Sequence, residues 1–551
     1  MRFFEVSLAL GALLSLGANA SPIDVDLVER QNTFFAITGP TGTSAGVAPR
    51  LEVRDLANNA DQWNLFVLAM SRFQSKAQDG KLSWYQVAGI HGRPYVNWDG
   101  VGPYQSSPWW PGYCPHSSNL FGSWHRPYIL LFEQLLIQYA NEVINEIPAG
   151  ATKTRYQTAV KTLRFPYWDW AKKTTGGIMP TTATQAQISV TFPQNGTTAS
   201  IPNPLYSYRQ KVLPNRDFDS NYANQQQTTR LADAEARLNA AYTSRRNNLL
   251  TLFSLNQKFN NFTTDANGNT SPNVEAIHNG IHVDVGGWMQ QIAYSAFDPI
   301  FAMHHCNVDR VVAIWQKLYP NSWVESAAQG AGTRTMAPSS IQGPDSPLTP
   351  FHSNTGGSFW TSNTVRDINT LGYTYPDLQN IASNQVLISN LNRLYGNSAT
   401  NTALKASVNG NSPQTTYDYL AQITLDKTAL GGQSYAIEFS LEGAYIGSYA
   451  ALALPTPPGA PGQSGPVTSS GTMMFTDALA QKGVDTSDQD ATIDYLSKNL
   501  QWKVVQNGAT VNNVKNLNVT VCSLEVKPAK ATNQFPTWVS PPEAIANSTS
   551  S

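Results

Sequence analysis

The chain contains eight histidines in 551 residues, and the spacing of several suits metal binding. His278 and His282 lie four residues apart in a stretch with helical periodicity, so both imidazoles should project from one face of a helix. Such a pair can chelate one metal ion, and His305 on the next expected helix would complete a three-nitrogen site. Two unrelated helical histidines are the alternative. Asn279 follows His278 where zinc proteases carry a glutamate, so the HExxH pattern is absent.

Three further histidines, His91, His116 and His125, lie upstream and form a second candidate triad. Coordination by imidazoles alone, without thiolate or carboxylate, suits copper and also zinc. Dinuclear sites are commonly built between the facing helices of a bundle. The two triads therefore predict a pair of metal ions that could bind dioxygen between them.

Apolar periodicity predicts the helices that would carry these side chains. They span residues 58–73, 124–147, 224–253, 274–282 and 300–318, and the third is polar enough to be expected at the surface. We predict one mainly α-helical domain over residues 31–380, with a four-helix bundle around the metal site. Because 551 residues exceed one average core, a second domain is expected.

The character of the sequence changes after Tyr375. Residues 381–415, which end in a stretch rich in Ser, Thr, Asn and Gly, predict a linker. Residues 417–447 alternate in the manner of strands, and residues 502–526 are again strand-like. We therefore predict a β-rich C-terminal domain over residues 416–551.

Several motifs occur in order around the histidines. They are His91-Gly-Arg-Pro, Cys114-Pro-His116, Trp124-His-Arg-Pro-Tyr128, Pro166-Tyr-Trp-Asp-Trp170, His278-Asn-Gly-Ile-His282 and Asp298-Pro-Ile-Phe301 followed by His304-His-Cys-Asn-Val-Asp-Arg310. Over roughly residues 33–375 the chain resembles the type-3 copper protein family, and within it the secreted fungal tyrosinases. The C-terminal region is similar to the tail domain of fungal members. The motifs are numerous and correctly spaced, which makes the resemblance specific.

The resemblance implies two copper ions per chain, with dioxygen as co-substrate. The implied ligands of the first copper are His91, His116 and His125, and those of the second are His278, His282 and His305. In the family the last ligand lies four residues before an aspartate on the same helix. Asp309 lies four residues after His305, so His305 is taken as the ligand and His304 as a residue behind it.

Four neighbouring residues are further candidates for the site, and the role of the first is implied by the resemblance. Phe301 resembles the residue that packs over the site and holds the ligands. Asp309 is expected to accept a hydrogen bond from an imidazole N–H, with an ordinary salt bridge to a nearby arginine as the alternative. Ile292 and Ala296, just before the Asp298 motif, are the candidates for residues that line the substrate pocket.

The three cysteines do not form a disulfide scaffold. Cys114 lies two residues before His116, and in similar proteins this cysteine forms a thioether to the ligand histidine. A buried free thiol is the alternative. Cys306 is expected behind the second copper site, and Cys522 is either structural or involved in copper delivery.

Glu275 and Asn279 flank His278 and resemble the pair that holds and activates a water near the copper in monophenol-active members. A general base would help because a phenol with a pKa of about 10 is barely ionised at neutral pH. Glu275 could instead simply favour the first turn of its helix. The occurrence of both residues beside a ligand favours the functional interpretation.

The implied activity is o-hydroxylation of monophenols and oxidation of o-diphenols to o-quinones by dioxygen, on tyrosine-like phenols and catechols. A catechol oxidase without hydroxylation is one alternative, against which Asn279 argues. A hemocyanin-like oxygen carrier is another, although a single catalytic unit with a leader and a tail fits an enzyme better. A zinc or structural metal protein is a third, and copper content would separate it from the others.

Related fungal enzymes carry a β-rich tail that covers the copper site until proteolysis, and Tyr373-Thr-Tyr375 resembles the motif that ends their catalytic domain. We therefore expect a latent full-length chain that an unidentified protease activates by cleavage between about Tyr375 and Ser412. The segment Met473–Phe475 is the candidate for the part of the tail that plugs the site.

Residues 1–20 resemble a signal peptide, with Arg2, an apolar run over 6–16 and the small-residue pattern Ala18-Asn-Ala20. The run is shorter than the roughly 20 residues that span a membrane. Arg30 is a candidate second processing point, which would make residues 21–30 a short propeptide. Secretion is expected, with glycosylation sequons that begin at Asn195, Asn261, Asn269, Asn518 and Asn547. The net charge of −1 lacks the basic footprint of a nucleic-acid binder.

Overall fold

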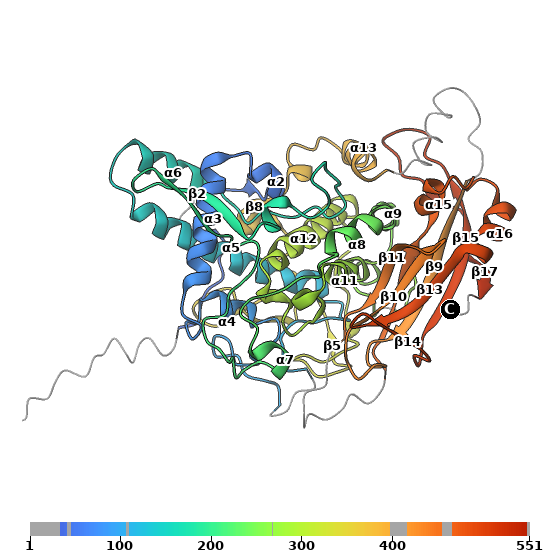
Figure 1. Ribbon diagram of the computed structural model, residues 1–551, viewed down its shortest axis with the longest axis horizontal. Coiled ribbons are helices and arrows are strands. Elements are labelled where there is room, and N and C mark those ends of the chain that lie inside the picture. The colour runs from blue at the N-terminus through green and yellow to red at the C-terminus, as the bar shows by residue number, and fades with distance from the viewer. Residues whose placement is uncertain are drawn as a thin grey trace, which may run out of the picture.

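The computed structural model describes residues 33–40, 46–105, 110–266, 268–396, 416–453 and 466–547. Helices fill the left and centre of Figure 1, and the strands of the C-terminal part lie against them on the right in orange and red. The predicted order of a helical domain followed by a β-rich domain is confirmed. Within the described residues, no helix is both long and apolar enough to cross a membrane.

The helical domain is built from helices of very different burial. Its helices are α2 (Val53–Leu56), α3 (Ala60–Ser75), α4 (Trp84–Ala88), α5 (Phe121–Asn145), α6 (Ala151–Thr162), α7 (Ser220–Ala223), α8 (Ala234–Ala240), α9 (Tyr242–Ser254), α10 (Phe259–Thr263), α11 (Val274–Val285), α12 (Ile300–Leu318) and α13 (Asn384–Tyr395). Nearly every residue of α5 and α12 is buried, so these two helices form the centre of the core. Helix α3 packs on α5, and α11 packs on both α5 and α12, which gives the bundle that was expected.

Short strand pairs brace the helical domain at its edges. They are β1 (Ala48–Pro49) with β8 (Tyr373–Thr374), β2 (Gln187–Phe192) with β3 (Thr197–Pro202), β4 (Ala327–Ala328) with β5 (Ile341–Gln342) and β6 (Pro347–His352) with β7 (Phe359–Thr361). The first pair is parallel and joins the beginning of the domain to its end. The two ends of the domain therefore close on each other.

A buried carboxylate on α12 joins three distant parts of the chain. Asp309 accepts hydrogen bonds from Arg126 Nε at 2.7 Å and Arg50 Nη1 at 3.2 Å, and from the hydroxyls of Tyr373 and Tyr375 at 2.7 Å each. The expectation that Asp309 accepts from an imidazole is therefore wrong. All its bonds go to arginines and tyrosines of other elements, because these donors surround it in the core.

Residues 224–253 do not form the single surface helix that was predicted. The helical part is limited to α8 and α9, and residues such as Ser244, Asn247 and Asn248 are buried although they are polar. The cause is the C-terminal domain, whose strand β12 (Thr468–Met474) and helix α15 (Thr476–Gln481) pack against α9. The polar composition of α9 therefore reflects its position at the interface between the two domains rather than exposure to solvent.

The predicted linker over residues 381–415 is only partly a linker. Its first part folds as α13, with Leu387, Leu391 and Tyr395 buried in the core of the helical domain. Ser383 caps this helix by accepting a hydrogen bond from Val386 N. The later residues 397–415 lie outside the described residues.

The C-terminal domain consists of two facing antiparallel sheets. One has the strand order β11 (Ala444–Ala451), β10 (Tyr435–Leu441), β13 (Leu500–Gln506), β14 (Ala509–Val511), and the other has β12, β9 (Thr416–Asp426), β15 (Asn518–Lys527), β16 (Thr537–Trp538), with β17 (Glu543–Asn547) also on β15 and helix α16 (Gln489–Asn499) beside β10 and β13. Tyr435, Ile437 and Phe439 share a core with Ala421 of β9 and Val521 of β15. Side chains from both sheets thus fill one sandwich core.

Replacing Asp309 by alanine should lower the free energy of unfolding by about 3–5 kcal/mol, because the buried guanidiniums of Arg50 and Arg126 would lose a shared counter-ion. Chemical denaturation monitored by circular dichroism measures this change. Asp494→Ala is the matched control, because Asp494 forms a solvent-exposed ion pair with Lys498 that should contribute little to stability. Equal stability of the two variants would contradict the structural role of Asp309.

Candidate metal centre

The six histidines of the two predicted triads come together from four parts of the helical domain. His91 follows α4, His116 precedes α5, His125 lies in α5, His278 and His282 lie in α11, and His305 lies in α12. All are at least 99% buried. In the first group the ring centroids are 5.3–6.1 Å apart, and in the second they are 4.4–5.8 Å apart. The rings of His125 and His305 stack at 4.2 Å, so the two groups adjoin.

Oxygen atoms hold the Nδ1 side of four of these rings. The partners are Ile292 O for His91, Phe121 O for His125, Asn279 Oδ1 for His278 and Met289 O for His282, at 2.6–2.9 Å. An oxygen partner of this kind accepts the Nδ1 proton, which fixes the tautomer and leaves a lone pair on Nε2.

The Nε2 atoms of the second group converge, and those of His278 and His282 carry lone pairs when their Nδ1 protons go to these oxygen partners. His278 Nε2 lies 2.9 Å from His282 Nε2 and 3.2 Å from His305 Nε2, while the buried His91 Nε2 has no hydrogen-bond partner. Lone pairs that face each other this closely repel unless a cation lies among them. The donor set and its tautomers therefore fit a metal ion in each group.

Burial keeps these imidazoles neutral, as metal ligands must be. It lowers the pKa of His125 to about 3 and that of His282 to about 4. It also lowers the pKa values of His91, His116 and His305, and the neighbouring histidines lower them further. The cluster would therefore present unprotonated nitrogens across the physiological pH range.

His304 was expected behind the ligand His305, but its ring lies directly beside the second group. Its ring is 4.9 Å from those of His278 and His282, and its two nitrogens have no hydrogen-bond partner. Of His304 and His305, it is His305 whose Nε2 lies beside His278 Nε2 and whose ring stacks on His125 of the first group. Its position between the groups supports His305 as the ligand.

Phe301 packs on the histidines of both groups. Its ring lies 4.2 Å from His305, 4.9 Å from His91 and 5.9 Å from His282. Phe301 precedes His305 by one helical turn, so the two side chains share a face of α12. It can therefore limit the movement of three rings at once.

Cys114 lies between two histidines of the first group. Its Sγ is 3.3 Å from His116 Nδ1, 4.0 Å from His116 Nε2 and 3.2 Å from His125 Nε2. Burial raises the pKa of the thiol. Cys306 instead points to the carbonyl of Phe165, and Cys522 lies far along the chain on β15 beside Gln422.

Glu275 and Asn279 belong to a buried polar network beside His278. Glu275 accepts hydrogen bonds from Ser117 N and Thr264 Oγ1 at 2.7 Å each. Asn279 donates to Asp265 Oδ2 at 3.1 Å while its Oδ1 faces His278 Nδ1. Burial raises the pKa of Glu275, the charge of Asp265 raises it further, and Lys427 lowers it. A carboxyl group with a raised pKa is a suitable proton acceptor.

Two members of this network, Asp265 and Lys427, were not found from the sequence. Asp265 lies in a loop and Lys427 comes directly after β9 in the other domain, so no local periodicity connects them with the histidines. Their only sequence signal is that each is a charged residue in a mainly uncharged stretch.

Ile292 and Ala296 are core residues, and neither lines the cavity between α11 and the C-terminal domain. Both side chains are 98% buried, and Ile292 contributes its carbonyl oxygen to His91. The expectation that they line a substrate pocket is replaced by a positioning role for the Ile292 backbone. The segment before Asp298 is held in place by Arg230, whose guanidinium donates hydrogen bonds to the carboxylate of Asp298 at 2.7 and 2.9 Å.

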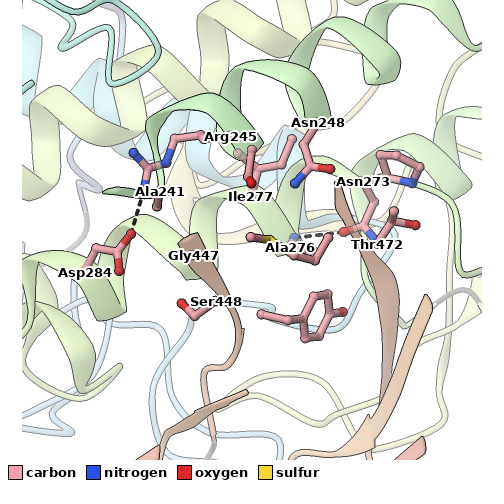
Figure 2. Close-up of a pocket in the computed structure, with 15 residues that line it drawn as sticks. Ala241, Arg245, Asn248, Asn273, Ala276, Ile277, Asp284, Gly447, Ser448 and Thr472 are labelled. Carbon is pink, nitrogen blue, oxygen red and sulfur yellow. Dashed lines mark hydrogen bonds and ion pairs between the residues drawn. The ribbon is translucent and has the colours of Figure 1, made fainter. Parts of the chain in front are cut away.

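The C-terminal domain covers the outer face of α11. Figure 2 shows strands β11 and β12 against this helix, with the ion pair between Arg245 and Asp284 at one side. The residues drawn there line a cavity of about 30 Å³. This volume holds about one water molecule. Gly280 lies against β11, and a Cβ at this position would make an ordinary contact of 3.8 Å with Ser448 O.

The segment Met473–Phe475 does not reach the histidines. Met473 and Phe475 lie in a core that also contains Ala276 of α11, Met473 lines the cavity beside this helix, and Met474 lies in a small cluster with Cys522. Neither cluster contains a histidine, so the segment packs against the helix that carries two of the predicted ligands and does not plug the site itself. Other C-terminal residues join the core of the helical domain instead, namely Ala436, Ala450, Leu452 and Val467. The alternation of β12 places Met473 and Met474 on opposite faces of its sheet.

Comparison with known proteins identifies both domains. The common central domain of tyrosinase matches residues 81–318, and the tyrosinase C-terminal domain matches residues 418–521. The chain belongs to the tyrosinase family. The first matched region contains all six histidines of the predicted triads, and the second covers the sandwich.

Tyrosinases of two filamentous fungi are similar over 376 residues. That of Podospora anserina is 37% identical and that of Neurospora crassa 36%, in each case over 63% of this chain. The chain spans 65% and 55% of the length of these two relatives. The solved structure of latent and active mushroom tyrosinase is 26% identical with a TM-score of 0.80, over 92% of this chain and 97% of that one. Both domains thus share the arrangement found there.

Family membership decides between copper and zinc, which the imidazole donors alone leave open. Tyrosinases hold two copper ions, and the structure has two buried groups of candidate ligand atoms, with the atoms of each group within 4.8 Å of one another. One group is His278, His282, His304 and His305, and the other is His91, His125 and Cys114. The predicted ligand His116 lies beside the second of these groups, with its Nδ1 at 3.3 Å from Cys114 Sγ.

Replacing His305 by alanine should reduce the bound copper from two ions per chain to one, because the second group would lose the nitrogen that meets His278 Nε2. Replacing His304 should leave both ions bound. Metal analysis of the dialysed full-length protein measures this. His352→Ala is the control, since His352 pairs with Asp99 outside both groups. A loss of copper in His304→Ala but not in His305→Ala would reverse the assignment.

Proposed function

We propose that the chain is a copper-dependent phenol oxidase that hydroxylates monophenols at the ortho position and oxidises o-diphenols to o-quinones. The observation that carries the proposal is the convergence of unprotonated histidine nitrogens from two adjoining groups. Bound copper would supply the binding and reduction of dioxygen. One dioxygen and one monophenol give one o-quinone and one water, and one dioxygen oxidises two catechols with release of two waters.

The residues of the chain would hold and prepare the phenol. Asn279 and Glu275 flank His278, and Glu275 is a buried carboxylate whose pKa burial raises. We propose that Glu275 accepts the phenolic proton, through a water that Asn279 orients. The hydrogen bond from Asn279 to Asp265 would keep the amide oxygen turned towards His278 Nδ1. A catechol oxidase remains the second candidate, and the presence of Asn279 favours hydroxylation.

We also propose that the full-length chain is latent. The support is that β11 and β12 pack on α11, the helix that carries two copper ligands. Within the predicted range of Tyr375 to Ser412, we propose cleavage after Gly396. Upstream of that point, Tyr395 is buried and bonds to Asp169 and Arg310 of the helical domain. The activating partner is a protease.

Secretion is a further proposal. The leader over residues 1–20 and the short propeptide over residues 21–30 lie outside the described residues. Of the five sequons, Asn195 and Asn518 have exposed side chains, Asn261 and Asn269 are half-buried, and the side chain of Asn547 lies outside the described residues. N-terminal sequencing of protein from the medium tests the cleavage, and a start at Met1 would contradict it.

We propose a thioether between Cys114 Sγ and the imidazole carbon of His116 that lies between its two nitrogens. Sγ approaches both nitrogens on that side of the ring. The bond replaces the thiol hydrogen and the ring hydrogen, and the two electrons and two protons pass to dioxygen. Mass spectrometry of the copper-loaded protein should show the single peptide that contains Cys114 and His116 lighter by two hydrogen atoms. Cys114→Ser should lack this loss, and an unlinked wild type would contradict the bond.

Oxygen uptake tests the proposed activity. Copper-loaded protein trimmed after Gly396 should consume dioxygen with a monophenol and with a catechol. Uptake with the catechol alone would leave a catechol oxidase, and no uptake despite bound copper would favour an oxygen carrier. Asn279→Ala should lower the monophenol rate by roughly tenfold or more relative to the catechol rate, because the proton acceptor would lose its orienting partner. Equal losses on both substrates would exclude that role.

A further inference from the structure

One charged side chain of the C-terminal domain reaches the network beside the copper ligands. Lys427 Nζ lies 2.7 Å from Asp265 Oδ2 and 3.3 Å from Glu275 Oε1. All three side chains are fully buried. Burial alone would lower the pKa of Lys427, but Asp265 and Glu275 raise it, so the amine is an ammonium ion.

This contact differs from the other ion pairs between the domains. Arg237 pairs with Glu438 and Arg246 with Asp477, and each of these arginines is 17–19% exposed. In both, the helical domain supplies the cation, whereas at Lys427 it supplies the anions. The polarity is reversed and the site is fully buried. A docking position that kept these groups buried but apart would leave Lys427 or the carboxylates without a counter-ion.

Lys427 also changes what Glu275 can do. With Ser117 N on Oε1 and Thr264 Oγ1 on Oε2, the ammonium group completes the hydrogen bonds of the carboxylate. Ser469 Oγ and Ser470 N of the same domain bind the Asp265 side chain and carbonyl at 2.8 and 2.7 Å. In the docked state the proposed proton acceptor is therefore already occupied by a cation.

We propose that Lys427 is an internal latch: its ammonium group holds the C-terminal domain on the Asp265–Glu275 pair and withholds Glu275 from the phenol. The inference rests on the proposed latent oxidase. It adds a chemical block to steric covering, since the tail supplies a cation where the phenolic proton would go. Removal of the tail would free both carboxylates together.

The latch can be tested on the copper-loaded full-length chain. After cleavage between residues 396 and 416, size-exclusion chromatography over a dilution series measures how tightly the two parts stay associated. Lys427→Met should weaken the association about tenfold or more, because the docked domain would bury two carboxylates without a counter-ion. The uncleaved variant should also oxidise catechol several-fold faster than the uncleaved wild type. Lys498→Met removes an exposed lysine of the same domain and should change neither.

A double-mutant cycle separates the latch from general damage. Asp265→Asn leaves the tail sequence intact and should weaken association like Lys427→Met, even if the latter folds poorly. The double variant should lose little more than the single ones, since the two residues act on each other. Unchanged association in Asp265→Asn, or fully additive losses, would overturn the proposal. A trimmed wild type without oxygen uptake would overturn the oxidase function instead, which the association measurement does not depend on.

Discussion

The structure depends on the confinement of several uncharged imidazoles in one buried space. Nε2 atoms of the second group lie only 2.9–3.2 Å apart, so the surrounding residues must hold these rings in place. Carbonyl oxygens of Ile292, Phe121 and Met289 fix three of the rings, and Phe301 packs against three rings. The helices that supply these groups must stay in register for a metal to find its ligands.

The relative position of α5 and α12 is set by an ion pair close to the predicted ligands. Arg126 follows His125, and it binds Asp309, which lies one turn after His305. The ion pair thus ties α5 to α12 next to the point where their histidines stack. Tyr373 and Tyr375 add the end of the domain to the same carboxylate. The buried carboxylate of Asp309 therefore holds the two ligand-bearing helices together and also anchors the end of the helical domain.

What could be predicted from the sequence was local or carried by motifs. Four-residue spacing brought His278 and His282 to one face of α11, and apolar periodicity located α12. The partners of Asp309 could not be predicted in this way, because Arg50 lies 259 residues away. Lys427 and Asp265 likewise meet only when the two domains dock. The burial of α9 was missed for the same reason, since its polar composition does not reveal the domain that covers it.

The polar character of α9 has a consequence for the exposed form of the protein. Much of the surface that the C-terminal domain hides on this helix consists of hydroxyl and amide side chains such as Ser244, Asn247 and Asn248. Permanent interfaces are mostly apolar, and their exposure promotes aggregation. A face of this kind can be rehydrated at little cost in solubility. If the C-terminal domain is removed as proposed, this face of α9 would therefore meet water through polar side chains.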